Sequence, residues 1–376
     1  MRLRRSLLAV SAFAFLLALT GCRGFFQPED DSDNGGGGTG TPPRFAFVAN
    51  AANATTQGSL TGFTVNPSTG ALTATADTPL LVTGSPNSVA SDDEGSLLYV
   101  AAQAGGISGY QINATSGALT LVPGAPFVAG ANPVSVAVDP NARFLFVANN
   151  GSGTVSIFNI GSSGELTQLS NSPVSVGPNP LRVTLDRTGR LLYVANGGSG
   201  TYVFRVGPTD GTLTLTRNVP VNNGTSSRAV AIDPIGQFAY VANGATTGGV
   251  DAYAMNAFNG DLTLIPGSPF PTGGSTPSSL AIHPTGKFLY VANQNSGTVA
   301  AFTINNDGTL TAISGSPFTS GNGPVDVAPD PSGRFLYVAN SNNGNVSVFS
   351  IGSAGGLTRT ATVAQPSNAA SVVVTK

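Results

Sequence analysis

The sequence has very little of what most catalytic and metal-binding sites are made of. Its 376 residues include one cysteine, one histidine and no tryptophan, and charged residues make up 9% of the chain. The single cysteine, Cys22, excludes an intramolecular disulfide and a thiolate metal site. The 16 Lys and Arg residues are scattered and are balanced by 18 Asp and Glu, whereas nucleic-acid binding needs clustered positive charge. We therefore expect no nucleic-acid partner.

Motifs for nucleotides and metal ions are also missing. The chain contains no P-loop, no G-x-G-x-x-G at a strand–helix junction and no H-E-x-x-H. Aspartates recur one per repeat, far apart in the sequence, whereas a calcium site needs about six to eight converging oxygens. We therefore expect no cofactor and no metal site.

The N-terminus is typical of an exported protein. Three arginines within the first five residues precede an apolar run over residues 7–19. A run of about 13 apolar residues suits a secretory signal and is too short for an ordinary transmembrane helix. The run leads into the tetrapeptide LTGC, which resembles the lipobox of bacterial lipoproteins and ends at Cys22. This resemblance implies a signal peptide over residues 1–21 and lipidation of Cys22; the alternative is an ordinary cleaved signal with an incidental cysteine.

Residues 22–43 are acidic, then glycine-rich, and end in two prolines. Such a composition buries no core and favours an extended tether. The expected organisation is thus a lipid anchor, a tether and a folded domain over residues 44–376. We expect a monomer held in the bacterial cell envelope, on the outer membrane or on the periplasmic or cell-surface side.

One hexapeptide pattern recurs along the folded domain. Its seven copies begin at residues 45, 97, 144, 191, 238, 288 and 335, with spacings of 52, 47, 47, 47, 50 and 47 residues, and FLYVAN is the form at 288–293. Val, Phe, Tyr, Thr and Leu dominate the runs between Gly-, Pro- and Asn-rich turns, and no run shows a helical period. The repeat is therefore a unit of short strands.

Each unit contains four strands, as residues 133–180 illustrate with PVSVAVD, RFLFVAN, GTVSIFNI and ELTQLSN. Strands that are apolar on both faces must be covered on both sides, which is the situation of a propeller blade between two others. The first copy lacks its preceding strand, and the C-terminal AASVVVTK supplies one of that type. We predict an all-β fold, a seven-bladed β-propeller with four antiparallel strands per blade, closed by the C-terminal strand.

The repeats D-P-x-G-x-F-L-Y-V-A-N and G-x-L-T…G-S-P-F resemble YVTN-type repeats and the seven-bladed propeller lactonases, the 6-phosphogluconolactonase-like family. The resemblance covers residues 44–376. It implies a propeller and, as an expectation, lactone hydrolysis at the mouth of the central channel. In that family an active blade carries an Arg-His pair followed by a Glu. Here Arg228 matches the arginine, Ala229 stands in place of the histidine, and the glutamate is missing.

Candidate binding residues are found by aligning the repeats on the aspartate that follows each first strand. The aligned position holds Ser88, Ser135, Arg182, Ala229, Ser279 and Asp326, and the preceding one holds Asn87, Val134, Leu181, Arg228, Ser278 and Val325. The charged and polar members form the candidate ligand site: Arg182, Arg228, Asp326, Asn87, Ser88, Ser135 and Ser279. Three alternatives remain: an Arg–Asp pair is satisfied internally, two arginines bind a carboxylate or phosphate, or these positions do not face the channel.

The only histidine, His283, aligns with the turn aspartates of the other repeats. That turn lies at the opposite end of the first strand from the candidate residues, so we expect His283 to have a turn role. No catalytic base is therefore evident.

The leading prediction from these observations is an exported binding or scaffold module for an envelope protein, a glycan or a small anionic ligand, without turnover. The alternative is a lactonase-like hydrolase of sugar lactones working at the channel mouth. A passive surface-layer or adhesion component is the third possibility.

Overall fold

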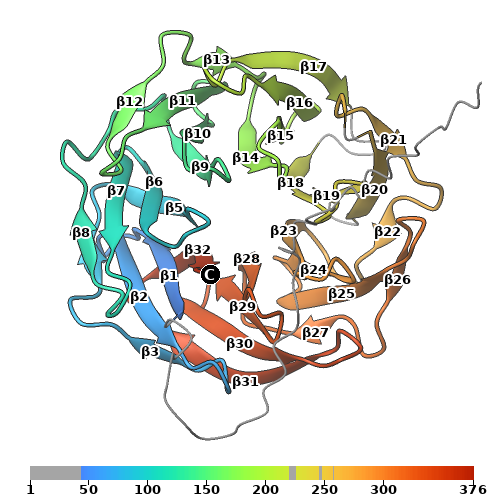
Figure 1. Cartoon of the computed structure of the whole chain (residues 1–376). Coiled ribbons are helices and arrows are strands. Elements are labelled where there is room, and N and C mark those ends of the chain that lie inside the picture. The colour runs from blue at the N-terminus through green and yellow to red at the C-terminus, as the bar shows by residue number, and fades with distance from the viewer. Residues whose placement is uncertain (1–43, 220–225, 245–247, 257) are drawn as a thin grey trace, which may run out of the picture. The chain divides into compact units, whose positions relative to one another are not determined.

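Seven antiparallel sheets form blades around a central channel, in the computed structural model of the chain (Figure 1). The structure describes residues 44–219, 226–244, 248–256 and 258–376. The predicted signal peptide, the tether and Cys22 lie outside the described residues. Every element in the described ranges is a strand. No helix in this part of the chain is long and apolar enough to cross a membrane.

The innermost strand of each blade lines the channel. In the order of blades 1 to 7 these strands are β32 (Asn368–Val374), β5 (Ser85–Ser91), β9 (Pro133–Val138), β14 (Pro180–Leu185), β18 (Ser227–Ile232), β23 (Pro277–Ile282) and β28 (Pro324–Pro329). The second strands carry the hexapeptide: β1 (Arg44–Ala51), β6 (Leu97–Gln103), β10 (Phe144–Asn149), β15 (Leu191–Asn196), β19 (Phe238–Asn243), β24 (Phe288–Asn293) and β29 (Phe335–Asn340).

The third strands are β2 (Ser59–Val65), β7 (Gly106–Ile112), β11 (Thr154–Ile160), β16 (Gly200–Val206), β20 (Gly249–Met255), β25 (Thr298–Ile304) and β30 (Asn345–Ile351). The outer strands are β3 (Leu72–Ala74), β8 (Leu119–Leu121), β12 (Leu166–Gln168), β17 (Leu213–Val219), β21 (Leu262–Leu264), β26 (Leu310–Ala312) and β31 (Leu357–Ala364). Four blades add a two-residue strand that pairs with the third strand: β4 (Leu80–Leu81), β13 (Val174–Ser175), β22 (Phe270–Pro271) and β27 (Phe318–Thr319).

The ring closes as predicted. Strand β32 pairs antiparallel with β1, so the two ends of the domain share blade 1. Thr375 extends this pairing, since its N–H donates to the carbonyl of Phe45 at 2.9 Å. Closure leaves every inner strand paired on its outward side, and it removes the open edge that a linear array of blades would expose.

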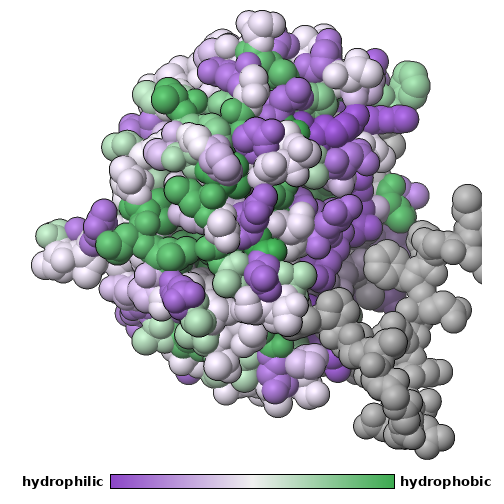
Figure 2. All heavy atoms as spheres, turned by 60° about the vertical axis from the view of Figure 1, so that its left-hand side comes forward, coloured by the Kyte–Doolittle hydropathy of each residue, from purple (hydrophilic) through white to green (hydrophobic). Residues whose placement is uncertain are grey.

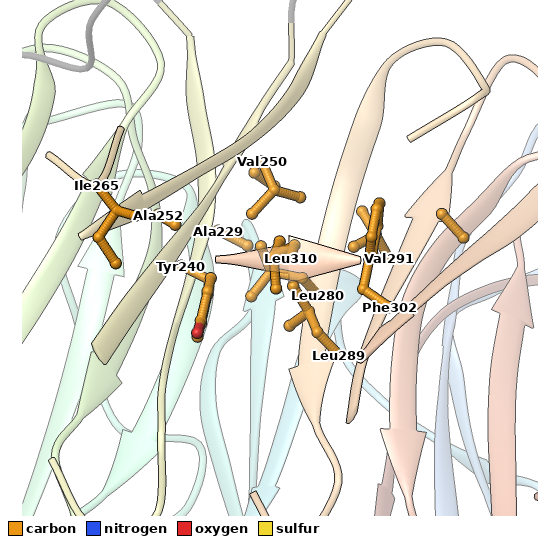
Figure 3. Close-up of a cluster of buried hydrophobic side chains, with 12 residues drawn as sticks. Ala229, Tyr240, Val250, Ala252, Ile265, Leu280, Leu289, Val291, Phe302 and Leu310 are labelled. Atoms are coloured by element: carbon orange, nitrogen blue, oxygen red, sulfur yellow. The ribbon is translucent and has the colours of Figure 1, made fainter. Parts of the chain in front are cut away.

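Apolar packing between neighbouring blades holds the ring together. The six residues of β10, for example, are all buried, because side chains from both faces of this strand enter the contacts with the adjacent blades. Figure 3 shows the cluster between blades 5 and 6, where Tyr240 and Val250 pack with Leu289 and Phe302. The double burial of the hexapeptide follows from this arrangement.

Tyrosine hydroxyls add polar ties between blades. In four interfaces the tyrosine of a second strand donates to a glycine carbonyl in the turn before an outer strand of the next blade, over 2.8–3.1 Å: Tyr99 to Gly164, Tyr240 to Gly308, Tyr290 to Gly355 and Tyr337 to Gly70. Burial raises the pKa of all four phenols. They therefore remain neutral donors.

The outer surface mixes apolar and hydrophilic residues on the side turned forward in Figure 2. The large apolar side chains that are exposed include Leu81, Leu121 and Val128. Single exposed apolar residues are ordinary on soluble domains, so they do not mark the function.

Candidate functional site

The central channel contains a cavity of about 390 Å³. Residues from all seven inner strands line it, and its polar lining side chains are Ser88, Ser91, Ser135, Arg182, Thr184, Asp326 and Ser371. The remaining lining is small or aliphatic, mostly Val, Ala, Leu and Ile. A cavity of this size matches pockets for small molecules, which span roughly 300–1,000 Å³.

A register shift in each inner strand sets the direction of the candidate side chains. In all seven blades the pairing between inner and second strands skips one residue: Asn87, Val134, Leu181, Arg228, Ser278, Val325 and Ala370. Such a bulge leaves the extra residue unpaired and re-aims its neighbours. The residue after the bulge is the aligned position of the sequence, which holds Ser88, Ser135, Arg182, Ala229, Ser279, Asp326 and, in the closing strand, Ser371.

Arg182 and Asp326 meet in the channel. Nη1 of Arg182 donates to Oδ1 of Asp326 over 2.9 Å, from β14 in blade 4 to β28 in blade 7. The side chain of Arg182 is 29% exposed, and that of Asp326 is 7% exposed. The pair therefore places one positive and one negative group at a cavity whose other lining residues are uncharged.

Asp326 is held by four donors. Oδ1 also accepts from Ser279 Oγ at 2.9 Å, and Oδ2 accepts from Ser371 Oγ at 2.8 Å and from the Val372 N–H at 3.2 Å. Ser371 and Val372 belong to the closing strand β32, whereas Ser279 comes from blade 6. The carboxylate is thus fixed in direction by donors from the two neighbouring blades, 6 and 1, and it orients the guanidinium of Arg182.

Ser88 and Ser135 form hydrogen bonds between neighbouring inner strands. Ser88 Oγ accepts the N–H of Val136 at 3.2 Å, and Ser135 Oγ accepts the N–H of Val183 at 3.2 Å. Each bond joins one inner strand to the next. Each hydroxyl keeps its own hydrogen as a donor, so both serines also offer polar contacts at the cavity that they line.

Three of the predicted residues lie outside the cavity lining as the described residues define it: Asn87, Arg228 and Ser279, of which Ser279 donates to Asp326. Asn87 and Arg228 are bulge residues on β5 and β18, and neither belongs to the lining. The Arg228 side chain packs over Gly244, where an added Cβ would lie 2.5 Å from Arg228 Cγ. Arg182 and Asp326 are thus together, and Arg228 is apart from them.

His283 lies in the turn after β23, as expected. Its Nε2 donates to the Gly333 carbonyl at 2.8 Å, and its Nδ1 accepts the Thr285 N–H at 3.1 Å. Burial lowers the pKa of His283. Both ring nitrogens are engaged in turn contacts, so this residue is part of the scaffold.

Two residues at informative positions were missed from the sequence. Ser371 lies in the C-terminal strand, and aligning that strand with the other inner strands would have placed it with Ser88 and Ser135. Asp251, on β20, is fully buried, and burial raises the pKa of its carboxyl to about 6 against the opposing effect of Asn243. Four other blades have a serine or threonine at its register position, namely Thr61, Ser108, Ser156 and Ser347. An alignment of the third strands would have shown Asp251 as an aspartate at a position where most other blades have a serine or threonine.

The comparisons with known proteins agree with this architecture. A family model described as lactonase, seven-bladed β-propeller, matches residues 46–374. A search of curated protein sequences found no match. Among solved structures, the periplasmic gluconolactonase of Pseudomonas aeruginosa is similar over 89% of this chain and 99% of its own, with a TM-score of 0.72 and 20% identity. A Bacteroides fragilis protein provisionally described as a 6-phosphogluconolactonase covers 91% of this chain and 100% of its own, with a TM-score of 0.76 and 19% identity. At these identities the structural likeness concerns the fold.

The family match corrects the leading prediction from the sequence. A binding or scaffold module without turnover was favoured because the Arg-His pair and the following Glu are missing. The match to the lactonase model overturns that prediction and supports the alternative. The alignment places Arg182 and Asp326 in one candidate site, and the structure shows that they form the Arg–Asp pair of the first alternative, with a carboxylate and a guanidinium lining the cavity from blades 7 and 4.

Proposed function

Because the chain belongs to the seven-bladed β-propeller lactonase family, we propose that it hydrolyses lactones, in the central channel. The single observation that carries this proposal is the Arg182–Asp326 pair at the cavity. Lactone hydrolysis adds water to an ester carbonyl and opens the ring to a hydroxy acid. It needs a donor for the carbonyl oxygen and an acceptor for a proton of the attacking water.

Arg182 is suited to the donor role. Its guanidinium carries five N–H hydrogens in a fixed plane, and its hydrogen bond to Asp326 runs through Nη1. Further N–H groups are therefore left to bind the lactone carbonyl oxygen. As water adds, negative charge grows on that oxygen, and a fixed cation stabilises the developing charge more than the neutral ester.

Asp326 is suited to the proton-acceptor role because it is the carboxylate that lines the cavity. In the free protein its oxygens are occupied by Arg182, Ser279, Ser371 and the Val372 amide. When the guanidinium moves onto the lactone oxygen with its other N–H groups, its Nη1 bond to Asp326 breaks and Oδ1 gains a free lone pair. The attacking water can then give its proton to Oδ1, and the proton passes to the ring oxygen when the C–O bond breaks.

The polar lining favours sugar lactones as the substrate class. Ser88 and Ser135 keep donor hydrogens, and Ser91 and Thr184 add hydroxyls to the same cavity. Hydroxyl groups of a sugar lactone match such a lining, whereas an apolar lactone leaves it unpaired. The similar Pseudomonas aeruginosa structure is that of a gluconolactonase.

The experiment is a lactone hydrolysis assay of the purified full chain by pH-stat, with glucono-1,5-lactone and its 6-phosphate. Arg182→Gln and Asp326→Asn are compared with wild type, and circular dichroism verifies that each variant is folded. We expect each substitution to lower kcat/KM by about 100-fold or more, as for loss of an oxyanion donor. Arg143→Gln is the matched control, because Arg143 pairs with Asp139 in a turn beyond the cavity lining. Wild-type rates equal to buffer, or full activity in both channel variants, would overturn the proposal.

We also propose that the protein is exported and anchored by lipid at Cys22. The support is the basic and apolar N-terminal segment that ends in LTGC and the periplasmic location named for the similar gluconolactonase. Metabolic labelling with a fatty-acid analogue tests the anchor. We expect label in wild type and none in Cys22→Ala; label in both would overturn it.

A further inference from the structure

A ring of side chain to backbone bonds links most inner strands to their neighbours. The side chain after the bulge accepts an N–H from the inner strand of the next blade. Asp326 accepts from Val372, Ser371 from Val89, Ser88 from Val136 and Ser135 from Val183, at 3.2–3.4 Å. These bonds join blades 7, 1, 2, 3 and 4 in sequence around the channel.

Among the described residues, no such bond continues the ring from blades 4, 5 and 6. In blade 6 the residue after the bulge, Ser279, donates to Asp326, and the gap beside Arg182 involves blades 4 and 5. The residue after the bulge is Arg182 in blade 4 and Ala229 in blade 5. An arginine side chain has donors and no acceptor, and an alanine side chain has neither. The N–H groups that correspond to those of Val136 and Val183 belong here to Val230 and Leu280, so neither faces a side-chain acceptor in the preceding blade.

The direction of these amides follows from the register. Val230 is opposite Val241, just as Val136 is opposite Val147 and Val183 is opposite Val194. The Val230 carbonyl accepts from Thr184 Oγ1 of blade 4 at 3.0 Å, so the polar edge of Val230 faces the neighbouring inner strand. Leu280, opposite Val291, has the equivalent place in blade 6.

Both residues belong to the wall of the cavity, and they lie between the two charged groups. Val230 and Leu280 line the channel cavity together with Arg182 and Asp326. Arg182 belongs to blade 4 and Asp326 to blade 7, and Figure 1 shows β18 and β23 on the arc between β14 and β28. The backbone N–H groups of Val230 and Leu280 therefore lie in the same sector of the channel as the guanidinium of Arg182.

We propose that the N–H groups of Val230 and Leu280, with the guanidinium of Arg182, form a site for an anionic oxygen. Its ligand class is a carboxylate of a sugar acid and, if the proposed lactone hydrolysis holds, the carbonyl oxygen of the lactone as it becomes an oxyanion. In that reaction the water oxygen bonds to the carbonyl carbon and the ring C–O bond breaks. The ring oxygen takes up the proton that Asp326 accepted from the water, the new carboxylic acid releases its remaining proton to solvent, and the product carboxylate stays on the same donors. Fixed backbone donors suit this role because they need no rearrangement as charge develops.

The choice of alanine at position 229 is what leaves the Leu280 amide open. Ala229 is buried, and a serine there would place Oγ where Ser135 and Ser88 place theirs. Ala229→Ser therefore restores the repeat and supplies Leu280 with an internal acceptor. The ligand then loses this donor, although the substituted residue itself touches no ligand.

The test measures binding and turnover separately in the full chain. Calorimetry with gluconate gives the carboxylate affinity, and the lactone assay gives kcat/KM. We expect Ala229→Ser to weaken gluconate binding about tenfold, which is the scale of one hydrogen bond to a charged group, and to lower kcat/KM at least as much. The amide resonances of Val230 and Leu280 should shift on gluconate addition in wild type, and that of Leu280 should shift little in Ala229→Ser.

Ala300→Ser is the matched control. It is also an alanine-to-serine change at a buried position where other blades have a hydroxyl, such as Ser156 and Ser347, and it lies on β25 away from the cavity lining. We expect wild-type affinity and rate from it. Gluconate binding that Ala229→Ser weakens, without any turnover, would support the anion site and overturn lactone hydrolysis. Turnover that Ala229→Ser leaves unchanged, or no gluconate binding by wild type, would overturn the anion site.

Discussion

Arg182 and Asp326 are 144 residues apart in the chain, and Arg182 Nη1 lies 2.9 Å from Asp326 Oδ1. The pair links blade 4 to blade 7 across the channel sector that blades 5 and 6 line. The two partners differ in how deeply they are embedded. Asp326 is almost buried and accepts four hydrogen bonds, whereas nearly a third of the Arg182 side chain is exposed.

This asymmetry predicts unequal stability effects. Asp326→Asn places an amide NH₂ against donors and leaves them unpaired, which should lower the free energy of unfolding by about 2–4 kcal/mol. Arg182→Met should cost about 1 kcal/mol or less, since water already reaches the guanidinium. Urea denaturation at pH 7 measures both. Equal losses would show that the pair, and not the wider set of donors, determines the stability of this region.

Asp251 predicts a variant that is more stable than wild type. Burial raises the pKa of its carboxyl from 3.8 to about 6, so the folded state favours the protonated acid. Its contribution to stability is present below pH 4 and is lost as the pH rises through 6. Asp251→Ser introduces the residue type that two other blades have at this position, Ser156 and Ser347. It should raise the free energy of unfolding at pH 8 by about 1–3 kcal/mol.

That gain should shrink as the pH falls toward 4, which urea midpoints at pH 8 and pH 4.5 would measure. Thr61→Ser, at the equivalent position of blade 1, is the control and should show no such pH dependence. A variant that is less stable than wild type at both pH values would contradict this account.

His283 predicts a pH effect of the opposite sign. Burial lowers its pKa below 6.5, so the folded state favours the neutral ring, whose Nδ1 accepts from Thr285. Its contribution to stability is present above pH 6.5 and is lost as the pH falls through the lowered folded-state pKa. His283→Asp introduces the aspartate that the equivalent turns of the other repeats carry. It should remove this part of the pH dependence of the free energy of unfolding. Thermal unfolding between pH 8 and pH 5 checks it: parallel curves for the two proteins would refute the prediction.

From the pairing of β32 with β1 we predict that residues 368–376 are essential for a closed ring. Deleting residues 368–376 exposes the edge of β1 and removes two of the donors to Asp326. We expect loss of cooperative unfolding and association of the truncated chain in size-exclusion chromatography. Lys376→Ala is the comparison, because its ion pair with Asp93 is exposed on both sides and should contribute less than about 1 kcal/mol. A monomeric, cooperatively folded truncation would contradict this prediction.

The sequence predicted the blades well because each repeat carries its own burial pattern. The FLYVAN strands are buried on both faces in the fold, and the C-terminal strand completes blade 1. Alignment also found the position after each bulge, since Ser88, Ser135, Arg182 and Asp326 line the cavity.

The partners of those residues could not be predicted in the same way. Whether Arg182 meets Asp326 or Arg228 depends on blade order and side-chain direction around the channel, and neither is written in a single repeat. The register position of Asp251 can be found by aligning the repeats, whereas its full burial and the raised pKa of its carboxyl follow only from the fold. The missing histidine favours a binding module when the sequence is taken alone, and the match to the lactonase family contradicts that prediction.

The way the ring closes also determines when the set of hydrogen bonds around Asp326 is complete. Ser371 and Val372, which donate to Oδ2 of Asp326, belong to the strand that closes the ring by pairing with β1. The carboxylate therefore has its full set of donors only after blade 1 has been completed. Any change that keeps β32 from pairing with β1 therefore also removes two donors from Asp326, so the fold and the cavity are completed in a single event.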